Sequence, residues 1–185
     1  MTIRKILRVD QPDDLKILKT RSHPVKQFTP ALRQLADDMF ETMHTANGVG
    51  LAAPQVGILQ RMVVIWIPPV IEELDDGSER EVVPEQNYVL INPEIVKEAP
   101  HEMTGLEGCL SMPGWYADVP RQAWVTVDYH DLDGKRRRIR RATGLLARAL
   151  QHEIDHLDGV LFTERIRDLT TLKDYTNEPE TPPAE

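Results

Sequence analysis

The segment "GLLARALQHEIDHLDG" at residues 144 to 159 constrains the fold more than any other part of the chain. Its apolar side chains recur at helical spacing and Gly159 marks a C-terminal stop, so we expect one helix here. The apolar positions are Leu145, Leu146, Ala149, Leu150, Ile154 and Leu157. The same helix carries His152, Glu153 and His156, which are costly to bury unless something pairs with them.

These three polar residues form the pattern HExxH. Two histidines four residues apart lie on one helical face, one turn apart, so both imidazoles reach the same ion while Glu153 points near it. The alternative is a polar stripe that faces solvent. Leu145 and Ala149 share the face of His152 and His156, which favours a metal site over that stripe.

A catalytic metal site needs a third protein ligand and one open position. Phe162 stands where the longer HExxHxxGxxH pattern has its final histidine, and Glu178 and Glu180 fall in a proline-rich stretch. Cys109 remains, and a thiolate with two imidazoles forms a soft metal site. It is the only cysteine, so it forms no internal disulfide; a buried apolar residue and a nucleophile are the other interpretations of it.

The remaining patterns predict strands between two helices. An amphipathic helix is expected after Thr29, with Pro30 in its first turn and a stop at Asn47-Gly48. We also expect a strand at 61–67, an acidic hairpin or loop at 68–87, a strand at 88–92 that ends before Pro93, a turn at 111–114, and a hairpin around Asp133-Gly134. The predicted fold class is α+β, with mostly antiparallel sheets packed around the C-terminal HExxH helix and an earlier amphipathic helix.

We expect a single domain over residues 1 to 170 and a disordered, acidic, proline-rich tail over 171 to 185. The formal net charge of -8 disfavours direct binding to nucleic acid or to an anionic membrane. The basic run "KRRRIRR" at 135 to 141 is expected as an exposed strand of the last hairpin. Neither a signal peptide nor a membrane span is indicated, which predicts a cytoplasmic protein.

The segment "GVGLAA" at 48 to 53 fits the dinucleotide-binding pattern GxGxxA. That pattern must follow a strand and open a helix, whereas here a helix precedes it and a strand follows, so we exclude nucleotide binding. The segment leads to Gln55. This residue is either an ordinary turn residue or an amide donor to a developing oxyanion.

Together, "GVGLAAPQ", "EGCLS" and "QHEIDH" resemble the three signature motifs of the peptide deformylases, in that order and at these separations. The resemblance covers about residues 3 to 168. It includes "ILRV", "HPV", the Asn92-Pro93 pair and the "VPR" after the second motif.

The resemblance implies a metal-dependent hydrolase that removes the formyl group from the N-terminal formylmethionine of nascent chains. By its motifs, Cys109, His152 and His156 are the metal ligands, Glu153 is the general acid and base, and Gln55 with the backbone N–H of Leu110 stabilises the oxyanion. It implies one Fe²⁺ per chain, replaceable by Zn²⁺, Ni²⁺ or Co²⁺. The residues implied to line the methionine pocket are Val49, Gly50, Glu107, Leu145, Arg148 and Ala149.

Two positions depart from many bacterial members of that family. Arg148 stands where those members have an apolar residue, although organellar-type members have arginine there. Tyr116 stands where many have an arginine that contacts the peptide, and we include it in the substrate site. The tail beyond 168 does not resemble the basic helix that some members use to dock on the ribosome, so at most a transient association with the ribosome is expected.

Two other functions compete with deformylation. An HExxH metallopeptidase that cuts internal peptide bonds would need a third histidine or glutamate ligand on ordered structure, and this chain lacks a good one. A catalytically inert metal-binding module would have four protein ligands and no exchangeable water.

Overall fold

A computed structural model describes residues 2–73 and 79–176. The α-helices are α1 (Pro12–Leu18), α2 (Pro30–Thr45) and α3 (Gly144–Leu157), and the short 3-10 helices are η1 (Ala53–Val56), η2 (Phe162–Glu164) and η3 (Leu169–Thr171). The strands are β1 (Gly50–Ala52), β2 (Met62–Ile67), β3 (Val70–Glu73), β4 (Glu79–Val83), β5 (Gln86–Glu98), β6 (Glu102–Cys109), β7 (Met112–Gln122), β8 (Trp124–His130), β9 (Arg136–Thr143) and β10 (Lys173–Asp174). This mixture of helices and antiparallel strands confirms the predicted α+β class.

The central sheet has five antiparallel strands in the order β1-β2-β5-β8-β9. Strand β2 is buried on both faces because its side chains alternate between two cores. Val63 and Ile65 pack toward α3, whereas Met62 and Val64 pack toward α2. The two predicted helices therefore cover opposite faces of one sheet.

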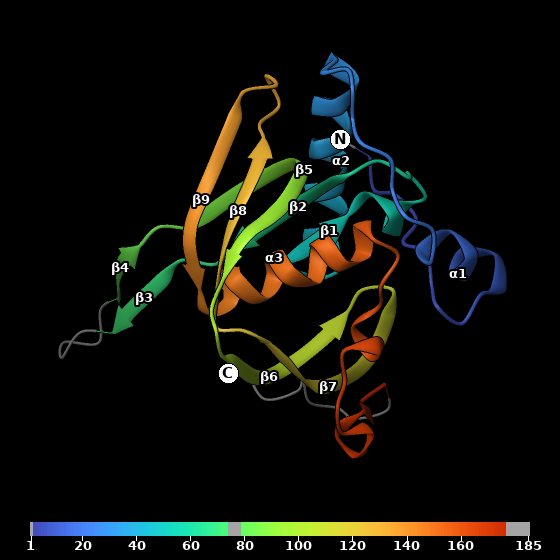
Figure 1. The fold of residues 1–185 in the computed structure, drawn as a ribbon, viewed down its shortest axis with the longest axis vertical. Helices are drawn as coiled ribbons and strands as arrows, with labels where there is room; N and C mark the ends of the chain where they lie inside the picture. Colours follow the sequence, from blue (N-terminus) through green and yellow to red (C-terminus); the bar gives the residue numbers. More distant parts are fainter. Residues whose placement is uncertain (1, 74–78, 177–185) are drawn as a thin grey trace.

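Strands β6 and β7 form a separate hairpin that crosses beneath α3 in Figure 1, so α3 lies between this hairpin and the central sheet. Side chains of α3 hold the hairpin in place. The amide of Gln151 exchanges two hydrogen bonds with the backbone of Gln122, and Arg148 donates to the carbonyl oxygens of Met103 and Val119. In this way the HExxH helix is enclosed on two sides.

Pro93 does not end a strand, contrary to the sequence prediction, because β5 continues through it to Glu98. The pairing with β8 shifts between Ile91 and Glu94, and such a bulge tolerates a residue without an N–H group. Asn92 adopts a φ of 52° there, and its side chain exchanges two hydrogen bonds with the backbone of Val25. A distant segment thus stabilises the bulge.

The turn predicted at 111–114 is also wrong in its position. It lies at Leu110 and Ser111, because Cys109 pairs directly with Met112 and residues 112–114 already belong to β7. Secondary structure continues past residue 170, into the part of the chain predicted as a tail, because η3 covers Leu169–Thr171 and β10 covers Lys173–Asp174. Residues 177–185 of the predicted disordered tail lie outside the described residues.

The last hairpin and the acidic hairpin occur where they are predicted, as β8–β9 and β3–β4. The DG turn signal at Asp76-Gly77 falls on residues outside the described part of the chain. All five arginines on β9 are exposed, as predicted. In the described residues, no helix has the length and apolar character needed to cross a bilayer.

Candidate metal centre and active site

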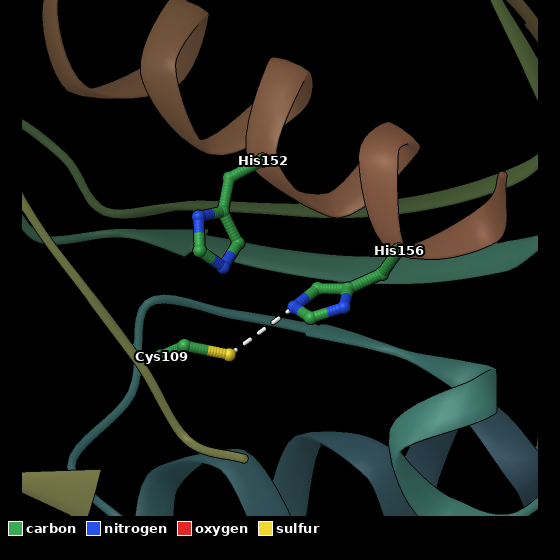
Figure 2. Close-up of side chains that lie close together, drawn as sticks. All are labelled: Cys109, His152 and His156. Carbon is green, nitrogen blue, oxygen red and sulfur yellow. Dashed lines mark hydrogen bonds between the residues drawn. The ribbon is translucent and has the colours of Figure 1, made fainter. Parts of the chain in front are cut away.

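Cys109, His152 and His156 converge on one point between β6 and α3. Their ligand atoms all lie within 4.8 Å of one another, and Sγ of Cys109 is 3.2 Å from Nε2 of His156. Figure 2 shows both imidazole rings projecting from α3 toward Cys109. One thiol and two imidazoles are donors that suit a transition metal or zinc, so this donor set fits the predicted ion.

Burial alone would raise the pKa of the Cys109 thiol, but the charge of His156 and hydrogen bonds from both histidines outweigh it and hold that pKa well below its usual value. A lowered pKa favours the thiolate, which is the form that binds metals. The surroundings of Cys109 thus suit a metal ligand.

Glu107 orients His152 from the side opposite the thiol. Its Oε2 lies 3.0 Å from Nδ1 of the imidazole. Burial would raise the pKa of Glu107, but hydrogen bonds from His152 and Arg121 and the charge of Arg121 lower it to about 2. Since an ionised carboxylate only accepts hydrogen bonds, Nδ1 carries the proton and Nε2 is left to bind a metal. The sequence interpretation placed Glu107 at the pocket but missed this contact.

Glu107 belongs to a buried cluster of charges that sequence reasoning also missed. Arg121 donates from Nε and Nη2 to the two oxygens of Glu107, at 2.9 and 3.0 Å, and from Nη1 to Asp155. Arg165 forms a two-point ion pair with Asp155, and Arg148 donates to Glu107 at 2.9 Å. Charges buried this deeply are tolerated only because each is paired. One hint of this cluster was present in the sequence, the arginine Arg121 in the segment "VPR".

Glu153 is buried in the wall of the same site. Within the described residues, its Oε2 and the Nδ1 of His156 are buried without a hydrogen-bond partner. Burial raises the pKa of Glu153, which makes its carboxylate a stronger base. A Cβ atom at Gly50 would lie 2.4 Å from Oε1 of Glu153, so only glycine leaves room for this carboxylate.

Gln55 faces the same centre from η1. Its Oε1 accepts a hydrogen bond from the N–H of Ala52 at 2.8 Å, which turns the amide NH₂ toward Cys109 Sγ at 3.6 Å and Ser111 Oγ at 3.2 Å. The N-terminal segment supports this arrangement. Leu7 N–H donates to the carbonyl of Gln55, and Val9 N–H donates to that of Ser111. Gln55 therefore presents a fixed donor to the site.

A cavity of about 450 Å³ opens beside these groups. Its lining includes every predicted site residue except the buried His156: Val49, Gly50, Gln55, Glu107, Cys109, Leu110, Tyr116, Leu145, Arg148, Ala149, His152 and Glu153. Leu145 lines this cavity and is 41% exposed, so it lies at the rim. Sequence reasoning missed Leu106 and Trp115, which also line the cavity.

Comparison with known proteins yields one family. The family model described as Polypeptide deformylase matches residues 3–171. A peptide deformylase of Roseiflexus sp. (strain RS-1) is 72% identical over 178 residues, which is 96% of each chain. One of Chloroflexus aggregans is 60% identical over 185 residues, covering 100% of this chain and 98% of that one.

Solved structures agree with these relatives. The crystal structure of peptide deformylase from Ehrlichia chaffeensis in complex with actinonin is similar with a TM-score of 0.77 and 39% identity, and the match covers 92% of both chains. The crystal structure of a peptide deformylase from Legionella pneumophila is similar with a TM-score of 0.75 and 42% identity over 92% of this chain and 89% of that one.

Proposed function

The chain belongs to the peptide deformylase family, and from this premise we propose that Cys109, His152 and His156 hold its metal while Glu153 moves the protons. The reaction is the metal-dependent hydrolysis of the formyl group from N-formylmethionine at the start of nascent polypeptides, which releases formate. One observation carries the assignment of residues: three ligand atoms lie within 4.8 Å of one another, and two of these residues line a cavity together with the buried carboxylate of Glu153.

The ion we propose is Fe²⁺, one per chain, which Zn²⁺, Ni²⁺ or Co²⁺ can replace. The mixed thiolate and imidazole donors support this proposal, because they suit all of these ions. When bound, such an ion polarises the formyl oxygen and lowers the pKa of a neighbouring water molecule. Glu107 fixes the tautomer of His152, so the ring of this ligand is already oriented before the ion binds.

Glu153 accepts the proton of the attacking water and returns it to the leaving amine. Its burial supports this role, because a desolvated carboxylate has a raised pKa and takes up a proton more readily. The space at Gly50 lets the carboxylate lie against the backbone of β1. Since Glu153 lines the cavity, both proton transfers take place inside it.

Gln55 and the backbone N–H of Leu110 donate hydrogen bonds to the formyl oxygen as it gains negative charge. The fixed direction of the Gln55 amide supports this, since a donor held in place costs no reorganisation during the reaction. Such a donor typically contributes about 3 kcal/mol to transition-state stabilisation.

The methionine side chain and the following backbone occupy the cavity along Val49, Gly50, Glu107, Tyr116, Leu145, Arg148 and Ala149. Mixed apolar and polar walls of this kind suit an apolar side chain on a polar backbone. The expected partners are formylated nascent chains, which ribosomes make in the cytoplasm. We also expect the protein to associate transiently with the ribosome. We propose that residues 1 to 170 act as one catalytic domain.

The experiment compares formate release from a formyl-Met-Ala-Ala peptide with cleavage of a long unformylated peptide, using protein purified without oxygen and analysed for metal. We expect formate and one free amine per substrate and no internal cleavage. Internal cleavage without formate would instead indicate an ordinary HExxH metallopeptidase, and bound metal with neither activity would indicate an inert module.

A variant tests the role of Glu153 in the same assay. Glu153→Gln keeps the shape of the side chain but removes its basicity, so we expect metal content equal to wild type and a deformylation rate lower by about 10²- to 10⁴-fold. Activity close to wild type would refute the assigned role.

A further inference from the structure

Residues 171 to 176, here called the C-terminal strap, run along the edge of β7 that β6 leaves free (Figure 1). The N–H of Asp118 donates to Oγ1 of Thr171 at 3.2 Å. Next along the strap, β10 pairs with β7, with Lys173 opposite Tyr116. The strap therefore supports the strand that carries Tyr116 from the side opposite to β6.

The far end of the strap closes on Gly114. Tyr175 N–H donates to the carbonyl of Gly114 at 2.7 Å. Gly114 has a φ of +80°, and a Cβ atom there would lie 2.2 Å from Cγ2 of Thr176, so the strap fits against bare backbone. Oδ1 of Asp174 accepts hydrogen bonds from N and Oγ1 of Thr176, at 2.9 and 2.6 Å, and fixes this end in a turn.

The strap also contacts the cavity wall through a pair of aromatic rings. The ring of Tyr175 meets the ring of Tyr116 edge to face, with centroids 5.8 Å apart and an interplanar angle of 82°. Edge-to-face pairs at this distance are attractive beyond the area that they bury. Gly114, Trp115 and Tyr116, which the strap holds, all line the cavity.

We infer that the strap determines how tightly the substrate binds, with Tyr175 as a positioning residue that holds Tyr116 at the cavity wall. The inference rests on the proposed function, because Tyr116 has a substrate to contact only if the cavity binds one. Tyr175 acts through Tyr116 and Gly114, whereas Gln55, Glu153 and the three metal ligands lie on η1, α3 and the end of β6. A loosened strap should therefore weaken binding and leave the chemical step intact.

The test uses the full chain with substitutions at Tyr175. Tyr175→Ala removes the ring but keeps the backbone hydrogen bond to Gly114, and Tyr175→Phe keeps both. Lys173→Ala is the matched control, since this residue is exposed and pairs with Tyr116 through its backbone. For each variant, kcat and KM for formyl-Met-Ala-Ala, metal content and thermal midpoint are measured.

We expect Tyr175→Ala to raise KM about threefold to tenfold, as loss of one aromatic pair predicts, with kcat and metal content within about twofold of wild type. Tyr175→Phe and Lys173→Ala should keep the wild-type KM. An unchanged KM in Tyr175→Ala would overturn the inference, and so would a fall in kcat or bound metal as large as the rise in KM. If Tyr175→Ala unfolds, the same comparison is made with Tyr175→Leu, which keeps an apolar side chain.

Failure of this inference is distinct from failure of the proposed function. A wild-type protein that releases no formate contradicts the function itself. A wild-type protein that does release formate, with a KM that Tyr175→Ala leaves unchanged, contradicts only the role of the strap.

Discussion

Oε2 of Glu107 lies 3.0 Å from Nδ1 of His152, and this contact links the proposed metal centre to a buried cluster of charges. The contact fixes which nitrogen of the ring carries the proton. Arg121 and Arg148 donate to the same carboxylate, so Glu107 is itself held in place from two sides. The orientation of His152, a proposed metal ligand on α3, thus depends on arginines of β7 and α3.

Glu107→Gln should weaken metal binding by about 10- to 100-fold, because an amide is a poorer acceptor for the N–H of His152. Competition with a chromophoric chelator measures this affinity. Glu102→Gln is the control, since Glu102 lies on the same strand and pairs at the surface with Arg167. Equal metal affinity in Glu107→Gln and in the control would show that the contact between Glu107 and His152 does not contribute to metal binding.

Arg121→Leu should lower the free energy of unfolding by about 3–5 kcal/mol, because it leaves Glu107 and Asp155 without their shared buried partner. Arg138→Leu removes an ion pair with Asp128 on the exposed face of β9 and should cost at most about 1 kcal/mol. Urea denaturation measures both. Similar losses for the two variants would contradict the importance of the buried cluster.

Gly50→Ala should lower kcat by about 10²-fold without loss of metal, because the new methyl group would displace the carboxylate of Glu153. Steady-state kinetics and metal analysis on the same sample separate these effects. A variant with full activity would mean that the position of Glu153 is not critical. Loss of metal in this variant would mean that the substitution disturbs the metal ligands rather than Glu153.

Gln55→Glu keeps an acceptor for the N–H of Ala52 but replaces the donor that faces Cys109 and Ser111. Without that donor, and with a negative charge near the formyl oxygen, kcat should fall by at least about 10²-fold. Single-turnover formate release isolates the chemical step. An unchanged rate would mean that other hydrogen-bond donors stabilise the oxyanion.

The two long helices and the last hairpin could be predicted because their patterns are local. Leu32, Leu35 and Met39 repeat on one face of α2, and residues on both sides of Asp133-Gly134 alternate. Helix α1 was missed because it is seven residues long and buries only Leu18. Its signals were Pro12 at the start and acids in the first turn.

The parts that could not be predicted depend on contacts between distant segments. Strand β5 runs through Pro93 because Asn92 is tied to Val25, far away in the sequence. The metal ligands could be proposed from HExxH and the lone cysteine. The burial of Glu107, Arg121 and Asp155 together could not, because no sequence spacing reveals which charges meet inside a fold.

The central claim is that one ion, held by Cys109 together with the two histidines of α3, is needed for removal of the formyl group. Anaerobic titration of metal-free protein with Fe²⁺, followed by formate release from formyl-Met-Ala-Ala, tests this claim most directly. We predict activity that rises linearly and stops at one ion per chain in the wild type, and almost none in Cys109→Ser over the same range. Full activity without metal, or the same titration curve in Cys109→Ser, would contradict the claim.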